Sequence, residues 1–176
     1  ILKELIADSD VFVENFKVGG LAKMGLDYES LKAINPRLIY LSITGFGQTG
    51  PMAKQPGYDY LIQGQGGLMS ITGTPDGEPG AGSQRVGVAI SDLTTGMNAT
   101  IAILAALHHK TNTGEGQHID IALLDVQVAT LANQGLNYLT TKQNPQRLGN
   151  GHPNIVPYQT FATQDGSIIL AVGNDK

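Results

Sequence analysis

Short apolar runs of strand length alternate along the chain with longer segments whose apolar residues recur at helical spacing. Three of the runs, at residues 10–14, 38–43 and 117–122, predict β-strands. The second run is apolar almost without interruption, which is typical of a strand in a parallel sheet covered on both faces. Helical spacing predicts helices at residues 2–7, 27–33, 58–70, 88–109 and 124–140.

Turn-forming residues separate these segments. Asp27 precedes one helical segment as an N-cap, and Asn35-Pro36 ends it, because proline disfavours helical backbone in the residue before it. Residues 74–87 and 142–155 are rich in glycine and proline and predict loops. Asp165-Gly166 predicts a turn between two further strand patterns, in a β-hairpin of residues 158–162 and 167–172.

The order of these elements predicts an α/β fold with a Rossmann-like, largely parallel sheet flanked by helices. We expect residues 1–140 to form part of a large domain, residues 141–155 a linker with a glycine loop, and residues 156–176 the start of a smaller α+β domain. The chain starts at Ile1 within a helical pattern and ends at Lys176 after a strand. We therefore expect an internal segment of a longer protein, with processing of a precursor as the alternative.

Composition narrows the classes of function. Hydrophobic residues make up 41% of the 176 residues and charged residues 15%, as in a globular chain that buries a core. The formal net charge of -4 argues against nucleic acid or an anionic membrane as a partner. The chain has no cysteine, which excludes disulfides, thiolate nucleophiles and thiolate metal sites in this segment. No apolar run approaches the roughly 18 residues of a membrane span and no signal peptide is visible, so we expect a cytoplasmic protein, or a mitochondrial-matrix protein in a eukaryote.

The stretch Gly45-Phe-Gly47-Gln-Thr-Gly50 fits the pattern G-x-G-x-x-G and follows a predicted strand. Dinucleotide binding requires a helix to begin at these glycines, since the helix N-terminus holds the pyrophosphate. Pro51 and Pro56-Gly57 come next instead, and no strand that ends in an acidic residue follows. We therefore interpret the stretch as a flexible glycine loop near a site.

Asp92 closes an apolar stretch and opens the long helical segment at residues 88–109. The free N–H groups and the dipole of a helix N-terminus favour the ionised carboxylate, whereas burial opposes it. A carboxylate that is charged yet poorly hydrated is a usable nucleophile. Thr95 and Gly96 fall on the same helix face, and a glycine inside a helix indicates that space is needed there. The alternative, which these residues alone favour, is an N-cap aspartate over a tightly packed helix.

Further candidate residues follow predicted strands or occupy loops. Asn15-Phe16-Lys17 and Lys23-Met24 follow the first strand, where the lysines either meet the phosphates of a ligand or lie in solvent. Tyr58-Asp59 begins a glycine-rich helical segment, where Tyr58 either hydrogen-bonds a substrate or anchors the helix. Gly149-Asn150-Gly151-His152 lies at the expected domain junction, in a loop that is either a lid or a linker.

Six segments, taken in order, resemble the class III CoA-transferases, which include the formyl-CoA, carnitine and succinate–hydroxymethylglutarate enzymes. The segments are DVFVENF, MGLDYESLKAINPRLIYLSITGFGQTGP, PGYD, VGVAISDLTTG, KTNTGEGQHIDIALLD and GNGHPNIVPYQTF. The similarity extends over essentially the whole chain. No single motif is specific for this family, but the ordered set of segments is. It implies a two-domain subunit that interlocks with a second copy in a homodimer.

The resemblance implies that Asp92 is the catalytic residue and that CoA is a substrate, with no metal. It places contacts to CoA at Asn15, Phe16, Lys17, Lys23, Met24, Tyr58 and Asp59, and the loop that covers the active site at Gly149, Asn150, Gly151 and His152. Relatives often carry arginine where this chain has Lys23. The formyl-CoA enzyme has a lysine just before its tyrosine, and this chain departs from that pattern with Pro56-Gly57.

The implied reaction moves CoA from an acyl-CoA to a carboxylic acid acceptor, through a mixed anhydride and a thioester on Asp92, behind a lid that excludes water. The runner-up is an α-methylacyl-CoA racemase or epimerase of the same fold, which pairs an aspartate with a histidine. Tyr58 stands where that histidine is expected, and tyrosine, with a pKa of about 10, is a poor base at neutral pH. Two other interpretations stay open: a non-catalytic nucleotide-binding module that uses residues 45–50, and a truncated chain that is itself inactive.

Overall fold

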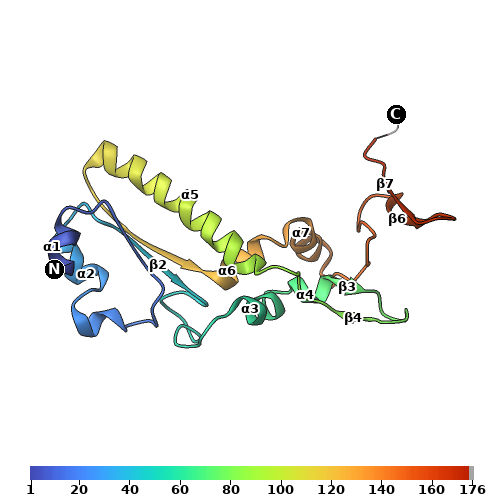
Figure 1. Cartoon of the computed structure of the whole chain (residues 1–176), viewed down its shortest axis with the longest axis horizontal. Helices are drawn as coiled ribbons and strands as arrows, with labels where there is room; N and C mark the ends of the chain where they lie inside the picture. Colours follow the sequence, from blue (N-terminus) through green and yellow to red (C-terminus); the bar gives the residue numbers. More distant parts are fainter. Residues whose placement is uncertain (175–176) are drawn as a thin grey trace.

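The computed structural model describes residues 1–174, and a three-stranded parallel sheet lies at the centre of its larger part (Figure 1). The strands, in the order β1-β2-β5, are β1 (Val11–Glu14), β2 (Ile39–Thr44) and β5 (His118–Ala122). Tyr40 of β2 pairs with Phe12 on one side and with His118 on the other. The sheet confirms the three predicted strands and their parallel direction, and its central strand is the most apolar run.

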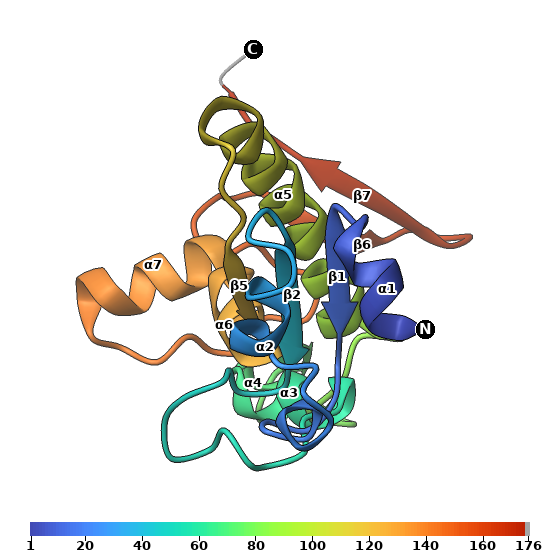
Figure 2. The same ribbon diagram turned by 90° about the vertical axis from the view of Figure 1, so that its left-hand side faces the viewer.

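Helices pack on both faces of this sheet, as in a Rossmann-like fold (Figure 2). Ile6 and Leu31 form a buried cluster with Tyr40 on one face. Because side chains alternate along a strand, Ile39 and Leu41 point to the opposite face, on which the longest helix packs. The helices are α1 (Leu2–Ala7), α2 (Tyr28–Lys32) and α5 (Ile90–Thr113), with a short 3-10 helix, η1 (Leu21–Met24), before α2.

Asp27 caps α2, as the sequence predicted. Its carboxylate accepts hydrogen bonds from the backbone N–H of Ser30 at 3.2 Å and from the Ser30 hydroxyl at 2.7 Å. These bonds stabilise the ionised form and lower the pKa of Asp27. The cap fixes where α2 begins, and α2 in turn brings Leu31 onto the sheet.

Helix α5 lies along the sheet and leaves much of its apolar surface uncovered (Figure 1). By length and composition alone it could cross a membrane, but the core helix of a soluble protein passes the same test. Only 22% of its most apolar stretch is buried in this chain. An exposed apolar stripe, which we call the α5 stripe, recurs at helical spacing along it and consists of Leu93, Met97, Ile101 and Leu104.

Two predicted helices are each divided in the structure. The segment at residues 58–70 forms α3 (Asp59–Gln65) and α4 (Leu68–Ile71), because Gly67 between them takes a φ of 84°. The segment at residues 124–140 forms α6 (Leu123–Ala129) and α7 (Ala132–Thr141), and Ala132 takes a φ of 51°. The single long helices were therefore wrong, because apolar spacing continues through a break that depends on one backbone angle.

Two hairpins complete the described chain. The loop expected at residues 74–87 contains a short antiparallel pair, β3 (Gly73–Thr74) and β4 (Gly82–Ser83), which the sequence did not predict. The predicted hairpin at Asp165-Gly166 is confirmed as β6 (Tyr158–Ala162) and β7 (Ser167–Ala171). It lies at the far end of the molecule from the parallel sheet (Figure 1). The domain boundaries at residues 140 and 156 stay predictions.

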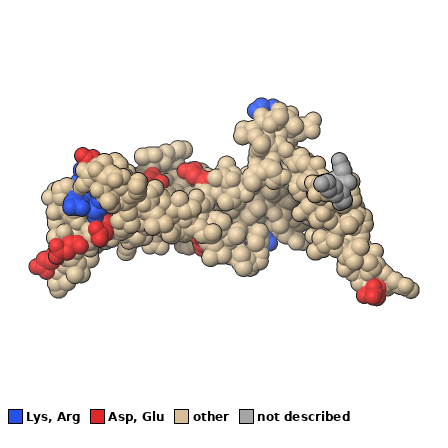
Figure 3. Space-filling view, turned by 90° about the horizontal axis from the view of Figure 1, so that it is seen from above, with Lys and Arg blue, Asp and Glu red and all other residues tan. Residues whose placement is uncertain are grey.

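Seen from above, the face that carries α5 is mostly uncharged through its middle (Figure 3). Basic and acidic side chains gather at the end of the molecule that holds the N-terminus, and elsewhere on this face only a few separate acidic and basic side chains are visible. The uncharged centre agrees with the apolar character of the α5 stripe. This face is therefore suited to contact with another apolar protein surface.

Candidate active site

Asp92 lies in the first turn of α5, and its side chain is exposed in this chain. The helix begins at Ile90, so Asp92 is its third residue, and Ala89 occupies the N-cap position without a side-chain cap. The alternative interpretation of Asp92 as the N-cap was therefore wrong. Because Val88, Ala89 and Ile90 are all apolar, the apolar pattern did not fix the residue at which the helix begins.

Another aspartate supplies the missing cap of α5. Asp59 is the first residue of α3, and its Oδ1 accepts the backbone N–H of Ser91 at 2.8 Å and, over a longer distance of 3.4 Å, that of Asp92. The free N–H groups of a helix start are commonly satisfied by an Asp or Ser side chain from the same segment. Here the acceptor comes from a different helix, so the cap also joins α3 to α5.

Buried glutamines hold both sides of this junction. Gln63 of α3 donates its amide to Asp59 Oδ2 at 2.8 Å, and its Oε1 accepts the backbone N–H of Val86 at 2.9 Å. Gln127 of α6 accepts the Ser91 hydroxyl at 2.6 Å. Both glutamines are almost completely buried, and a buried polar side chain with its partners in place rigidifies its surroundings. The start of α5 is therefore fixed from two neighbouring helices.

Electrostatics at this junction favour the protonated form of Asp92. Partial burial raises the pKa of Asp92, and the negative charge of Asp59 raises it further. The helix N-terminus acts in the opposite direction, since it stabilises a nearby negative charge. A carboxyl group that ionises less readily than usual, at an exposed point in a cluster of polar groups, is a candidate for chemistry.

The two neighbours that the sequence placed beside Asp92 differ in their surroundings. Thr95 is buried and donates its hydroxyl to the Ser91 carbonyl at 2.6 Å, so it stabilises the helix start and faces the core. Gly96 is exposed, and no atom of the described chain would lie within 4 Å of a Cβ placed there. The space that Gly96 leaves open is therefore available to a ligand or to another part of the protein.

The predicted CoA-contacting residues occupy two places in the fold. Asp59 contacts the backbone of Asp92, and Tyr58, its neighbour in the chain, occupies the N-cap position of α3 and is exposed. Asn15, Phe16 and Lys17 follow β1, and Lys23 and Met24 lie in η1, with Phe16 and Met24 exposed. Within residues 1–174, no hydrogen bond or ion pair joins this second group to Asp92. Their contacts to CoA stay predictions.

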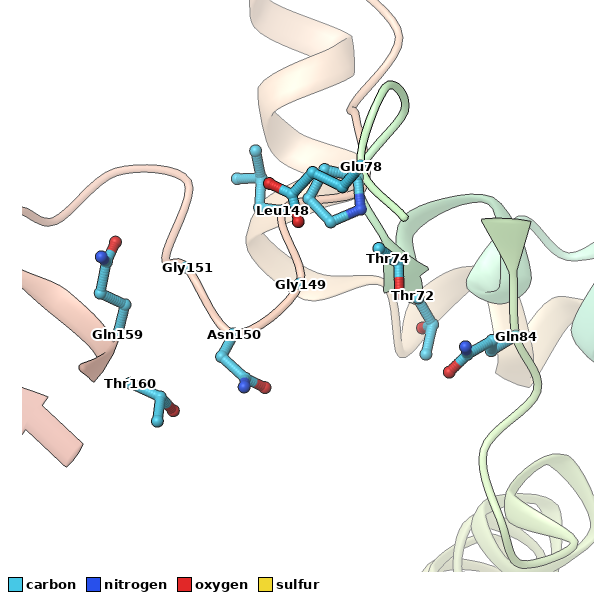
Figure 4. A pocket seen from close by; sticks show the side chains of 12 residues that line it. Thr72, Thr74, Glu78, Gln84, Leu148, Gly149, Asn150, Gly151, Gln159 and Thr160 are labelled. Carbon is cyan, nitrogen blue, oxygen red and sulfur yellow. The ribbon is translucent and has the colours of Figure 1, made fainter. Parts of the chain in front are cut away.

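The glycine loop lines a cavity of about 590 Å³, as the close view shows (Figure 4). Gly149, Asn150 and Gly151 face the hairpin of β3 and β4 across it, and Gln159 and Thr160 of β6 close it on another side. His152 lies outside the lining, where its backbone N–H bonds to the Tyr158 carbonyl at 3.0 Å. None of the candidates near α5 or β1 lines this cavity, so the described chain does not bring loop and Asp92 together in one pocket.

Arg147 ties the start of this loop to the neighbouring hairpin. Its guanidinium donates to the Thr74 carbonyl and to the Ser83 hydroxyl, each at 3.2 Å, and forms an ion pair with Asp76. Sequence reasoning missed this residue, because its partners lie more than sixty positions earlier in the chain. Arg147 therefore fixes the chain just before the glycine loop, and the glycine-rich residues follow it.

A second cavity, of about 340 Å³, lies beside the sheet. Ser42 Oγ and His118 Nε2 are 3.0 Å apart in its lining, and the Gln48 amide nitrogen there is buried without a hydrogen-bond partner in the described part of the chain. Of the predicted residues only Lys17 lines it. The alternation of side chains along β2 and β5 was the signal that would have grouped Ser42 and His118 on one face.

The glycine loop at residues 45–50 begins no helix, as the sequence analysis expected. It leaves β2 through turns, and Gly45 and Gly57 approach so closely that a Cβ on Gly45 would lie 2.5 Å from the Gly57 Cα. These glycines therefore serve a close contact between backbone segments. In the part of the chain that is described, no group of three His, Asp or Glu side chains is placed to hold a metal ion.

A parallel sheet whose strands lead into loops and helix starts with polar side chains is the arrangement of an α/β enzyme domain. In this chain Asp59 accepts the backbone N–H of Asp92, and its charge helps to raise the pKa of the Asp92 carboxyl group. The chain belongs to CoA-transferase family III, whose family model matches residues 1–176. The resemblance stated from the sequence is confirmed.

Relatives and solved structures agree with this family. The chain is 59% identical over 175 residues to a succinate–glutarate CoA-transferase of Agrobacterium fabrum, covering 99% of this chain and 43% of the relative. It is 48% identical to a human succinyl-CoA:glutarate CoA-transferase, covering 100% of this chain and 39% of the relative. The crystal structure of a CAIB/BAIF family protein from Brucella suis superposes with a TM-score of 0.88 at 56% identity, covering 99% of this chain and 45% of that one. The chain thus spans less than half the length of each.

Proposed function

We propose that the protein to which this chain belongs transfers CoA between carboxylic acids, with Asp92 as the nucleophile. The observation that carries the proposal is the exposed Asp92 carboxylate, to which no group of residues 1–174 donates a hydrogen bond. The chain has no cysteine that would serve as an alternative covalent carrier. Family membership supports the reaction class, and the raised pKa of Asp92 supports its selection among the carboxylates.

The proposed reaction has four balanced steps. An Asp92 oxygen attacks the thioester carbonyl of the acyl-CoA, the carbon–sulfur bond breaks, and CoA leaves as a thiolate beside a mixed anhydride. The thiolate attacks the aspartyl carbonyl of the anhydride, which releases the donor acid and leaves an Asp92–CoA thioester. The acceptor carboxylate then attacks the carbonyl of this thioester, the carbon–sulfur bond breaks, and a second anhydride forms beside the released CoA thiolate. The thiolate finally attacks the acyl carbonyl, which gives the new acyl-CoA and restores Asp92.

The substrates that we propose are short dicarboxylic acids and their CoA thioesters, with succinate and glutarate first. The names of the Agrobacterium fabrum and human relatives support this choice. For CoA itself we propose Asn15, Phe16, Lys17, Lys23, Met24 and Tyr58 as contacts, with the lysine ammonium groups toward phosphates. No metal takes part in the proposed steps.

We also propose a lid and a second subunit. A loop at Gly149, Asn150, Gly151 and His152 would exclude water from the anhydride, which water otherwise hydrolyses. Asp92 does not line the cavity of this loop in the described chain, so closure over Asp92 requires the remaining part of the protein or a second copy. The α5 stripe supports a homodimer, because its exposed apolar surface needs a cover.

The test is to trap the covalent intermediate in the full-length protein. Succinyl-CoA is added, the reaction is quenched with hydroxylamine or borohydride, and the modified carboxylate is mapped by mass spectrometry. We expect one label, on Asp92, and none in the Asp92→Asn variant. Asp125 is a matched control, because it is an exposed aspartate at the same third position of its helix, α6.

The Asp125→Asn variant should keep the label on Asp92 and full transfer. The Asp92→Asn variant should lose transfer by several orders of magnitude, as is usual on loss of a covalent nucleophile, about 10⁴-fold or more. An unlabelled protein that still transfers CoA would contradict the proposal, because the acceptor would then attack the acyl-CoA directly. A label on Asp59, Asp120 or Asp125 would support the covalent mechanism but would show that Asp92 is not the nucleophile.

A further inference from the structure

Two aspartates share the start of α5, and their surroundings differ. Asp59 accepts the free backbone N–H groups of Ser91 and Asp92, whereas no donor in the described chain bonds the Asp92 carboxylate. A carboxylate at the third position of a helix ordinarily folds back toward the free N–H groups of the first turn. Asp59 occupies two of these groups, the N–H of Ser91 and that of Asp92, and the Asp92 carboxylate accepts no hydrogen bond within residues 1–174.

We propose that Asp59 is a positioning residue for Asp92: it caps α5 from α3 and thereby holds the nucleophile on a fixed turn with its carboxylate unbonded. The proposal rests on the proposed role of Asp92 in CoA transfer. Hydrogen bonds to a carboxylate stabilise its charged form, and a stabilised charge is a weaker nucleophile. The cap therefore removes a competitor for the lone pairs that attack the thioester.

Asp59 is itself held in place, which distinguishes it from a surface carboxylate near a helix. Its second oxygen accepts the Gln63 amide, and Gln63 is fully buried with its own oxygen bonded to the Val86 N–H. The same Gln63 amide lies 3.4 Å from the Val88 carbonyl. Gln63 thus joins Asp59 to the segment that leads into α5, so that the cap and the helix start move as one unit.

The charges around Asp92 are few. Burial is the larger cause of the raised pKa of Asp92 and the charge of Asp59 is the smaller one, and no other charged group contributes to the shift. The other titratable side chains on elements that pack against α5 are Tyr60 of α3, Tyr40 of β2, His118 and Asp120 of β5, and Asp125 of α6. The Asp59 charge should therefore contribute to the lower pH limit of activity, because its removal lowers the pKa of Asp92.

The experiment compares the Asp59→Asn and Asp59→Ala variants of the full-length protein, with Asp125→Asn as control. Asparagine keeps an acceptor oxygen for the cap but removes the charge, and alanine removes both. We measure the single-turnover rate of adduct formation on Asp92 with succinyl-CoA, and kcat/KM as a function of pH. Circular dichroism and thermal unfolding report whether each variant is folded.

We expect the acid limb of kcat/KM to move to lower pH in the Asp59→Asn variant, while the control keeps the wild-type profile. In the Asp59→Ala variant the freed N–H groups bond to Asp92, and adduct formation should slow about tenfold or more with KM little changed. The Asp59→Asn variant should form the adduct at a rate close to that of the wild type, because asparagine keeps an acceptor oxygen for the cap. A role in folding alone would lower thermal stability without moving the acid limb.

The proposal is wrong if both Asp59 variants form the adduct at the wild-type rate and keep the wild-type acid limb. Should Asp59→Ala not fold, the acid limb of Asp59→Asn decides alone. Failure of the proposed function looks different, because the wild-type protein would then carry no label on Asp92. A labelled wild type with unaffected Asp59 variants would overturn only the role of Asp59.

Discussion

At the scale of single residues, Asp92 and Asp125 occupy equivalent positions in their helices. Each is an exposed aspartate at the third position of a helix. What separates them is a neighbour from elsewhere in the chain: Asp59 raises the pKa of Asp92 and caps its helix. Local sequence therefore identifies a class of candidates, and a tertiary contact selects one of them.

Asp10 and Lys110 give a residue-scale prediction about stability. Lys110 at the end of α5 is buried, and its ammonium group lies 2.8 Å from the exposed Asp10 carboxylate. The hydrogen bond and the charge of Lys110 lower the pKa of Asp10 below its usual 3.8. Because the pKa of Asp10 is lower in the folded state than in the unfolded state, the ion pair stabilises the fold fully above the unfolded pKa. This stability is lost as the pH falls through the folded pKa.

We expect Asp10→Asn in the full-length protein to lower the free energy of unfolding at pH 7, since a buried ammonium group loses its partner. The difference from wild type should shrink as the pH falls from the usual pKa of 3.8 toward the lowered folded pKa, because Asp10 then becomes protonated first in the unfolded state and afterwards in the folded state. Urea unfolding from pH 3 to pH 7 measures this. Asp8→Asn is the control, because Asp8 is also exposed but forms no ion pair in the described chain. A pH-independent difference would contradict the role of the ion pair.

At the scale of elements, α5 combines a helix start that holds the candidate nucleophile with a body that packs on the sheet. The exposed Gly96 stands one turn beyond Asp92, and open space surrounds the position of its absent Cβ. Glycine inside a helix costs about 1 kcal/mol relative to alanine. No packing within the described chain requires that cost, so we attribute Gly96 to something that approaches the helix from outside.

The Gly96→Ala variant should therefore unfold at a higher temperature and transfer CoA more slowly. The stabilisation should be about 1 kcal/mol, and the loss of activity should appear in kcat/KM. Gly135 provides the matched change, because it lies inside α7, where a Cβ would make an ordinary contact with Leu131 at 3.5 Å. Gly135→Ala should gain similar stability at full activity. Equal activities of the two variants would show that the space at Gly96 is not used.

At the scale of the whole molecule, the described chain is elongated and incompletely covered. The parallel sheet lies at one end and the hairpin of β6 and β7 at the other (Figure 1). The α5 stripe is exposed on the helix that packs on the sheet, and all five residues of β7 are exposed. The relatives are more than twice as long as this chain, so their additional segments are available as part of the cover.

We predict that a charge on the α5 stripe weakens association of the full-length protein. Ile101→Glu should shift the protein from dimer toward monomer and reduce transfer, because an ionised carboxylate is costly to bury in an apolar contact. Asn112→Glu, at a polar exposed position near the end of the same helix, should leave the dimer intact. Analytical ultracentrifugation measures the mass. A dimeric Ile101→Glu variant would show that the stripe is covered from within the same subunit.

The sequence by itself determined the elements whose pattern is continuous. The three strands, the cap at Asp27 and the hairpin at Asp165-Gly166 follow from apolar spacing and turn residues, which act locally. The ordered segments determined the family, and the choice of Asp92 as the nucleophile stays a prediction from that resemblance. These properties need no knowledge of which residues meet across the fold.

Tertiary structure alone decided how the site is assembled. The breaks at Gly67 and Ala132 depend on single backbone angles that apolar spacing does not encode. The cap that Asp59 places on α5 joins residues more than thirty positions apart, and its partners Gln63 and Gln127 become specific only through burial. Hydrogen bonds of this kind form between whichever groups the packing of helices brings into reach, so a linear pattern names the groups but not the pairs.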